Sequence, residues 1–163
     1  MPSDEYSALV APTMSEGGVA LRGVVHDPLA REGMGGVSGN AGLFSTLDDL
    51  MIYASMLLND GAWGGAEILA SRTARAMMMR PRGYEVFNRT LGWEHYDTCS
   101  QTGGDLLSTS TIGHTGATGT SIVIDPENDL IIVMLTNRAY ITKERFPLDF
   151  RSKIATVVGA ALL

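Results

Sequence analysis

The sequence has 163 residues, enough for one domain with a hydrophobic core and few for two. Its 45% apolar and 18% charged residues exclude an intrinsically disordered chain. The net charge is −6 and no cluster of lysines and arginines stands out, which argues against a nucleic-acid partner or an anionic membrane surface.

The single cysteine, Cys99, excludes an internal disulfide and a multi-cysteine metal site. The longest apolar run, residues 130–135, is too short to cross a bilayer, so we expect no membrane span. Residues 1–5 have no basic segment followed by an apolar one, so we expect no signal peptide and leave the localisation open.

Residues 1–44 are rich in glycine and have little periodicity, which predicts an irregular segment. A structureless loop of that length is uncommon in a compact domain. We therefore expect this segment to wrap around a partner element or to line a cleft.

Residues 45–80 have the periodicity of helices. Ser45, with Asp48 three residues later, predicts the N-cap of a first helix, which Gly61 ends. A second, shorter helix is expected from an N-cap at Ser71 to a point before Pro81.

Residues 89–136 have the periodicity of strands. We expect strands over residues 90–95, 120–124 and 130–136, the last two joined by a turn at residues 125–129. The last strand is apolar on both faces and is therefore expected to be covered on both. A C-terminal helix follows within residues 146–163. This order predicts an α+β fold, an antiparallel sheet with packed helices.

Residues 111–121 concentrate glycines and hydroxyl side chains directly before the expected hairpin. Glycines let a ligand lie against a strand, where hydroxyls and free N–H groups bind a carbonyl or a carboxylate. The alternative is a glycine-rich turn between strands, and the composition leaves both open.

Three segments carry a resemblance to a known family. His114-Thr115-Gly116 resembles the third sequence box of the penicillin-recognising serine hydrolases. Residues 35–46 (GGVSGNAGLFST) and 124–138 (IDPENDLIIVMLTNR) are similar to segments of their class C β-lactamase branch, which includes D-alanyl-D-alanine carboxypeptidases and esterases. The resemblance spans roughly residues 8–163. It implies one partial domain over residues 1–163, the C-terminal part of the β-lactamase/transpeptidase-like fold.

The resemblance also implies a reaction. Members of this family hydrolyse an ester, a β-lactam or a D-alanyl peptide through an acyl-serine, without a metal or organic cofactor. His114, Thr115 and Gly116 would then bind the substrate, and the Ala117 N–H would form half of the oxyanion hole. Asn137 and Arg138 are either an edge of the cleft that binds a substrate carboxylate or a strand-end cap with a surface arginine.

The sequence departs from the family at the boxes that supply the nucleophile. Its two lysines, Lys143 and Lys153, have Tyr140 and Phe150 three residues before them, so there is no Ser-x-x-Lys box, and there is no Tyr-x-Asn box. We therefore expect the C-terminal part of a hydrolase about twice this length, inactive alone.

Two alternatives come from other classes of protein. The first is a non-catalytic binding module that associates with itself as a homo-oligomer or with the missing N-terminal half. The second is a small esterase with Ser38, Ser45 or Ser121 as its nucleophile. We interpret His26 with Asp27, and His95 with Asp97, as surface or structural pairs and predict no metal.

Overall fold

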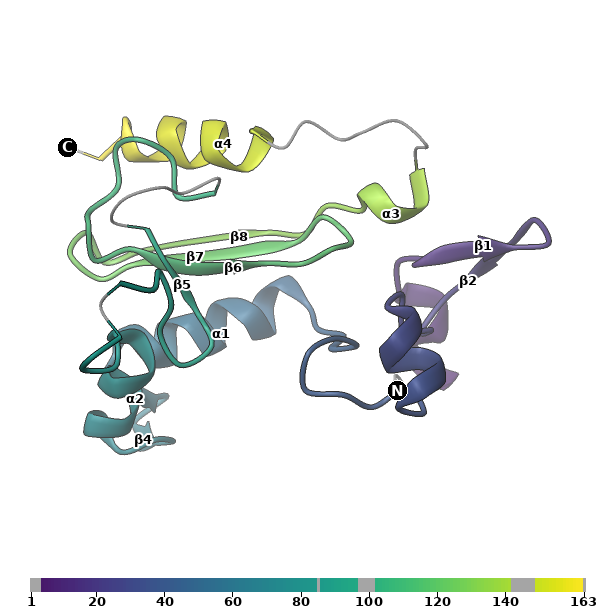
Figure 1. Ribbon diagram of the computed structural model, residues 1–163, viewed down its shortest axis with the longest axis horizontal. Coiled ribbons are helices and arrows are strands. Elements are labelled where there is room, and N and C mark those ends of the chain that lie inside the picture. The colour runs from purple at the N-terminus through teal and green to yellow at the C-terminus, as the bar shows by residue number, and fades with distance from the viewer. Residues whose placement is uncertain (1–3, 85, 97–101, 142–148, 163) are drawn as a thin grey trace.

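A computed structural model describes residues 4–84, 86–96, 102–141 and 149–162 (Figure 1). It is an α+β fold in which every strand pairing is antiparallel, as predicted. The elements in chain order are η1 Asp4–Leu9, β1 Met14–Glu16, β2 Val19–Leu21, η2 Leu29–Gly33, α1 Leu47–Leu58, β3 Ala62–Trp63, β4 Ala66–Glu67, α2 Ser71–Met78, β5 Glu94–His95, β6 Ile112–Thr115, β7 Ser121–Asp125, β8 Leu130–Met134, α3 Arg138–Ile141 and α4 Phe150–Gly159.

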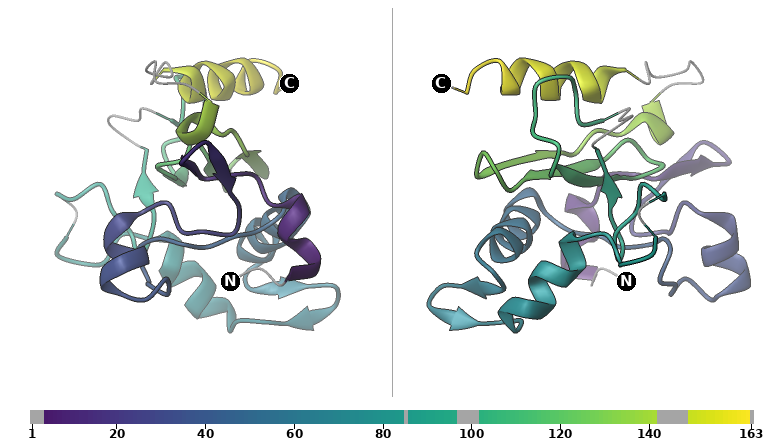
Figure 2. Two further views of the ribbon diagram at one scale, coloured as in Figure 1. Left: turned by 90° about the vertical axis from the view of Figure 1, so that its right-hand side faces the viewer. Right: turned by 60° about the vertical axis from the view of Figure 1, so that its left-hand side comes forward.

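In the described part of the chain, the main sheet has four strands in the order β5-β6-β7-β8. Helices α1 and α2 lie on one side of it and α4 on the other, so the body has three layers (Figures 1 and 2). The core fills the layer between the sheet and α1. Its buried members are Ala54, Met56, Leu57, Trp93, Ile112 and Ile124.

The register decides which side chains face α1. Ile112 pairs with Ile124 across β6 and β7, and both belong to the core. Successive residues of a strand point to opposite faces. Thr115 and its partner Ser121 therefore point toward α4, while His114 points to the α1 side.

Both predicted helices are present, but their caps differ by one residue. The cap of α1 is Thr46, whose Oγ1 accepts from the Asp49 N–H at 3.1 Å, rather than Ser45 with Asp48. Residues 45 and 46 offer the same hydroxyl-to-aspartate spacing, and Thr46 is the last extended residue before the helix. The predicted cap Ser71 is the first residue of α2, whose N-cap position is Ala70.

The hairpin of β7 and β8 is confirmed within two residues at each end. The strand predicted at residues 90–95 shrinks to Glu94–His95, because Thr90 and Trp93 close a turn with hydrogen bonds of 2.9 and 3.2 Å. The expectation that the last strand is covered on both faces was too strong. β8 is one of the two edge strands of the described sheet, and all five of its residues are only half-buried.

The glycine-rich N-terminal segment is more regular than predicted. β1 and β2 form a hairpin whose turn residues, Gly17 and Gly18, both have positive φ, the conformation that type I′ turns need. These elements lie at one end of the molecule, beside α3 (Figure 1). In the described part of the chain, no helix has the length and apolar character that crossing a membrane requires.

Candidate functional site

The segment 114–117 lies where β6 leaves the sheet and turns back. A turn is closed by the Gly119 N–H, which donates to the Gly116 carbonyl at 3.0 Å, and the Gly116 N–H donates to Thr120 at 2.8 Å. Gly119 has a φ of +121°, a region that favours glycine. A Cβ at Gly116 would lie 2.2 Å from Thr120 Oγ1. Both glycines are therefore required by this tight turn.

The outer edge of this segment is open. β5 pairs with β6 only at Ile112 and Gly113, so among the described residues no strand continues along residues 114–117. The Ala117 N–H, second in the turn, donates to no group in that part of the chain. An open strand edge with a free N–H can accept a substrate carbonyl.

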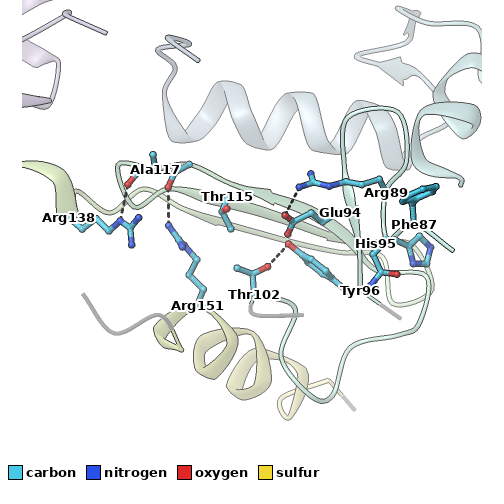
Figure 3. Close-up of a pocket in the computed structure, with 12 residues that line it drawn as sticks. Phe87, Arg89, Glu94, His95, Tyr96, Thr102, Thr115, Ala117, Arg138 and Arg151 are labelled. Atoms are coloured by element: carbon cyan, nitrogen blue, oxygen red, sulfur yellow. Dashed lines mark hydrogen bonds and ion pairs between the residues drawn. The ribbon is translucent and has the colours of Figure 1, made fainter. Parts of the chain in front are cut away.

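A cavity of about 560 Å³ opens beside this edge on the α4 side of the sheet (Figure 3). Thr115, Gly116 and Ala117 form one part of its wall. Arg138 and Arg151 reach the same turn from α3 and α4. Side chains around β5, including Arg89, Glu94 and Tyr96, line the rest.

Two guanidinium groups in this cavity, those of Arg138 and Arg151, have no carboxylate partner among the described residues. Arg151 is 9% exposed, and its Nη2 donates to the carbonyls of Gly116 and Thr120 at 3.2 Å. Its Nε has no hydrogen-bond partner among the described residues. Arg138 Nε donates to the Ala117 carbonyl at 2.8 Å. Within the described residues, neither arginine forms an ion pair.

Burial lowers the pKa of Arg151, and the charge of Arg138 lowers it further. Two neighbouring positive charges without a counterion favour an anion in this cavity.

Tyr96 adds a protonated hydroxyl to the cavity wall. Burial raises the pKa of Tyr96, and Thr102 donates a hydrogen bond to its oxygen (Figure 3). A Cβ at Gly113 would lie 2.8 Å from the Tyr96 hydroxyl oxygen, so a glycine is needed for the ring to approach β6.

His114 lies away from this cavity. It lines a second pocket of about 570 Å³ on the α1 side, together with Ser45, Asp49 and Tyr53. Its Nδ1 is 2.9 Å from the Thr115 carbonyl oxygen. The structure therefore separates His114 from Thr115, which the resemblance had put on one substrate surface.

The three candidate serines have different surroundings. Ser38 donates to Asn40 within an exposed loop, and Ser45 is exposed in the second pocket. Ser121 is 3% exposed, and its Oγ has no hydrogen-bond partner in the described chain. Across the described residues, none of these hydroxyls is hydrogen-bonded to a histidine or lysine.

Asn137 and Arg138 are separated in the same way. Asn137 Nδ2 donates to the Pro12 carbonyl at 2.8 Å, and its Oδ1 accepts from the Tyr140 N–H at 3.2 Å, so both ends of the amide are used. Arg138 lines the cavity. The amide of Asn137 ties α3 to the N-terminal segment.

The residues considered for a metal do not gather. His95 Nδ1 is 3.1 Å from Arg80 Nη2, and the His26 carbonyl accepts from Arg31. Asp97 and Cys99 lie outside the described residues. Among those that are described, no three histidine, cysteine, aspartate or glutamate side chains form a metal-binding group.

Arg151, Tyr96 and Thr102 were missed in the sequence. One signal pointed to Arg151. It lies four residues before Ala155 and eight before Gly159, so the three residues share one face of α4, which is the buried face. No local pattern indicated Tyr96 or Thr102, because only tertiary contacts bring these two residues close to β6.

Comparison with known proteins agrees with this architecture. The family profile named Beta-lactamase matches residues 4–155. Proteins named "Putative D-alanyl-D-alanine carboxypeptidase" from Escherichia coli O157:H7, Escherichia coli (strain K12) and Salmonella typhi are each 41% identical, over 120, 122 and 122 residues. The matched stretch covers 72–74% of this chain but only 27–28% of those relatives.

The described fold is an α+β fragment of the kind that this family contains. The chain belongs to the beta-lactamase family. The resemblance inferred from residues 35–46, 114–116 and 124–138 is thereby confirmed.

Proposed function

We propose that this chain is the substrate-binding part of a beta-lactamase-family serine hydrolase. It contributes one wall of the cleft and half of the oxyanion hole, the Ala117 N–H. The observation that carries this proposal is the free Ala117 N–H at an open strand edge beside a positively charged cavity. One such donor is worth about 10²–10³ in rate when it meets the developing oxyanion.

The nucleophile belongs to sequence that these 163 residues do not contain. No Ser-x-x-Lys or Tyr-x-Asn box is present, and no described serine is hydrogen-bonded to a histidine or lysine side chain. A serine hydroxyl without a base is a weak nucleophile. The chain alone is therefore expected to bind substrate without turning it over.

The charges of the cavity favour one class of substrate. Arg138 and Arg151 bring two positive charges to the turn, and no carboxylate of the described residues pairs with either. A substrate that carries a carboxylate, such as a β-lactam or a peptide ending in D-alanine, fits this potential better than a neutral ester.

Amide NMR of the ¹⁵N-alanine-labelled chain tests the proposal. Titration with benzylpenicillin or a D-alanyl-D-alanine peptide should shift the Ala117 resonance saturably, with weaker binding in high salt. Penicillin methyl ester is the matched neutral ligand and should bind less tightly. An Ala117 resonance that stays in place with all three ligands would contradict the proposal.

A second candidate function rests on the second pocket, whose lining residues include Ser45, Asp49 and His114. These are the residue types of a serine, acid and histidine set. Intact-mass analysis after treatment with a fluorophosphonate separates the two candidates. We expect no adduct; a stoichiometric adduct on Ser45, lost in Ser45→Ala, would favour the small esterase.

The third reading, a binding module that associates with itself, is favoured by exposed apolar side chains such as Leu43, which is 88% exposed. Sedimentation velocity over a range of concentrations tests it. A monomer at every concentration would count against this reading.

A further inference from the structure

The turn that presents the Ala117 N–H is held from outside by three later residues, Thr136, Arg138 and Arg151. The carbonyl oxygens of all five residues 116–120 accept hydrogen bonds from residues after β8. Arg151 Nη2 donates to the first and the last of them at 3.2 Å. Arg138 donates from Nε to the Ala117 carbonyl and from its backbone N–H to the Thr118 carbonyl, each at 2.8 Å. Thr136 Oγ1 donates to the Gly119 carbonyl at 2.6 Å.

These bonds supply what the turn lacks by itself. Two glycines give residues 116–119 a wide choice of backbone conformations, and only two internal hydrogen bonds restrict them. Hydrogen bonds from an ionised guanidinium are roughly twice as strong as neutral ones. With every carbonyl of the turn engaged, the direction of the unused Ala117 N–H is determined by the outside donors.

A buried arginine at position 151 would lower the stability of the fold if its only role were packing. It is 9% exposed, and in the part of the chain that the structure describes it pairs with no carboxylate and its Nε has no hydrogen-bond partner. Burying a charge costs free energy unless an opposite charge and hydrogen bonds compensate it. A guanidinium at this position is therefore better explained by what it does to the turn.

We propose that Arg138 and Arg151 are positioning residues that fix the direction of the Ala117 N–H by binding the carbonyl groups of its turn. The inference rests on the proposed function, in which that N–H meets the substrate oxyanion. In this role the two arginines act by hydrogen-bonding the backbone carbonyls of the turn. Their remaining N–H groups are left for contact with a ligand.

Backbone relaxation of the ¹⁵N-alanine-labelled chain tests this directly. In the wild type the Ala117 N–H should have an order parameter of about 0.85, and in Arg151→Met and Arg138→Gln it should fall below about 0.6. Ala54 and Ala74, buried in α1 and α2, should keep their values in both variants. Arg151→Lys should retain part of the order, and Arg72→Gln, on the exposed side of α2, is the matched control.

An Ala117 N–H that stays as ordered in both variants as in the wild type would overturn the inference. Should Arg151→Met fail to fold, Arg138→Gln and Thr136→Val give the same readout on a chain that keeps its buried guanidinium. Penicillin titration of the same samples separates the two proposals. If the Ala117 order parameter falls in the variants but penicillin does not shift the wild-type Ala117 resonance, the proposed function alone is contradicted. If the order parameter is unchanged in the variants but penicillin does shift the wild-type resonance, this inference alone is contradicted.

Discussion

The carboxylate of Asp125, at the end of β7, binds both the backbone N–H and the hydroxyl of Ser108, seventeen residues earlier. Asn128 Nδ2 adds a third hydrogen bond at 2.7 Å, and the carboxylate is fully buried. This relationship anchors the loop before β6 to the β7–β8 turn. The position of the segment 114–117 therefore depends on a contact outside the cavity.

Asp125→Asn should destabilise the chain by about 2–3 kcal/mol, because an amide NH₂ would face donors where a carboxylate oxygen accepted from them. Urea unfolding measures the change. Asp129→Asn is the matched control. Asp129 is exposed and has a φ of +49°, a conformation that asparagine adopts readily. The free energy of unfolding of this variant should therefore stay within about 0.5 kcal/mol of the wild-type value. Equal effects of the two variants would show that the buried carboxylate contributes nothing special.

The same carboxylate predicts a pH dependence. Burial raises the pKa of Asp125, but the hydrogen bonds from Ser108 and Asn128 outweigh it and hold the pKa below its ordinary value. The unfolded chain then takes up the proton first as the pH falls. The contribution of Asp125 is complete above the unfolded pKa of about 3.9 and is lost as the pH falls through the folded value.

Unfolding free energies of the wild type and Asp125→Asn, measured from pH 7 down to pH 2, should therefore converge in acid. A gap between the two proteins that stays constant down to pH 2 would contradict the assignment.

Gly113→Ala should cost about 1–3 kcal/mol, because its Cβ would lie 2.4 Å from the backbone oxygen of Ile122. That oxygen belongs to the sheet and cannot move without disturbing β7. Gly39→Ala, whose Cβ would meet nothing within 4 Å, should change the stability by less than about 0.5 kcal/mol. Thermal unfolding of the two variants side by side decides this.

Thr46→Ala should cost about 1 kcal/mol, since it removes the acceptor for the Asp49 N–H at the start of α1. Ser45→Ala should be nearly neutral. The pair also distinguishes the observed cap from the one predicted from the sequence: a larger loss at Ser45 would restore the original prediction. Helicity by circular dichroism and urea unfolding provide the two readings.

Much of the architecture follows from local patterns. The strands of residues 121–134 are recognisable because β-branched residues flank a proline and Asx turn, and α1 because its apolar stripe has helical spacing. The separation of His114 from Thr115 could also have been derived. Neighbours in a strand point to opposite faces, so two consecutive strand residues cannot both face the same side of the sheet.

The sequence by itself determined the family, the helices α1, α2 and α4 and the β7–β8 hairpin, because these depend on residues close together in the chain. Only the tertiary structure decided that Arg151 lies against Gly116, 35 residues earlier, and that Tyr96 packs on Gly113. The physical reason is that a hydrogen bond between distant segments leaves no periodic trace in either of them. Such contacts arise when α4 and the sheet pack together, and they give the cavity its charge.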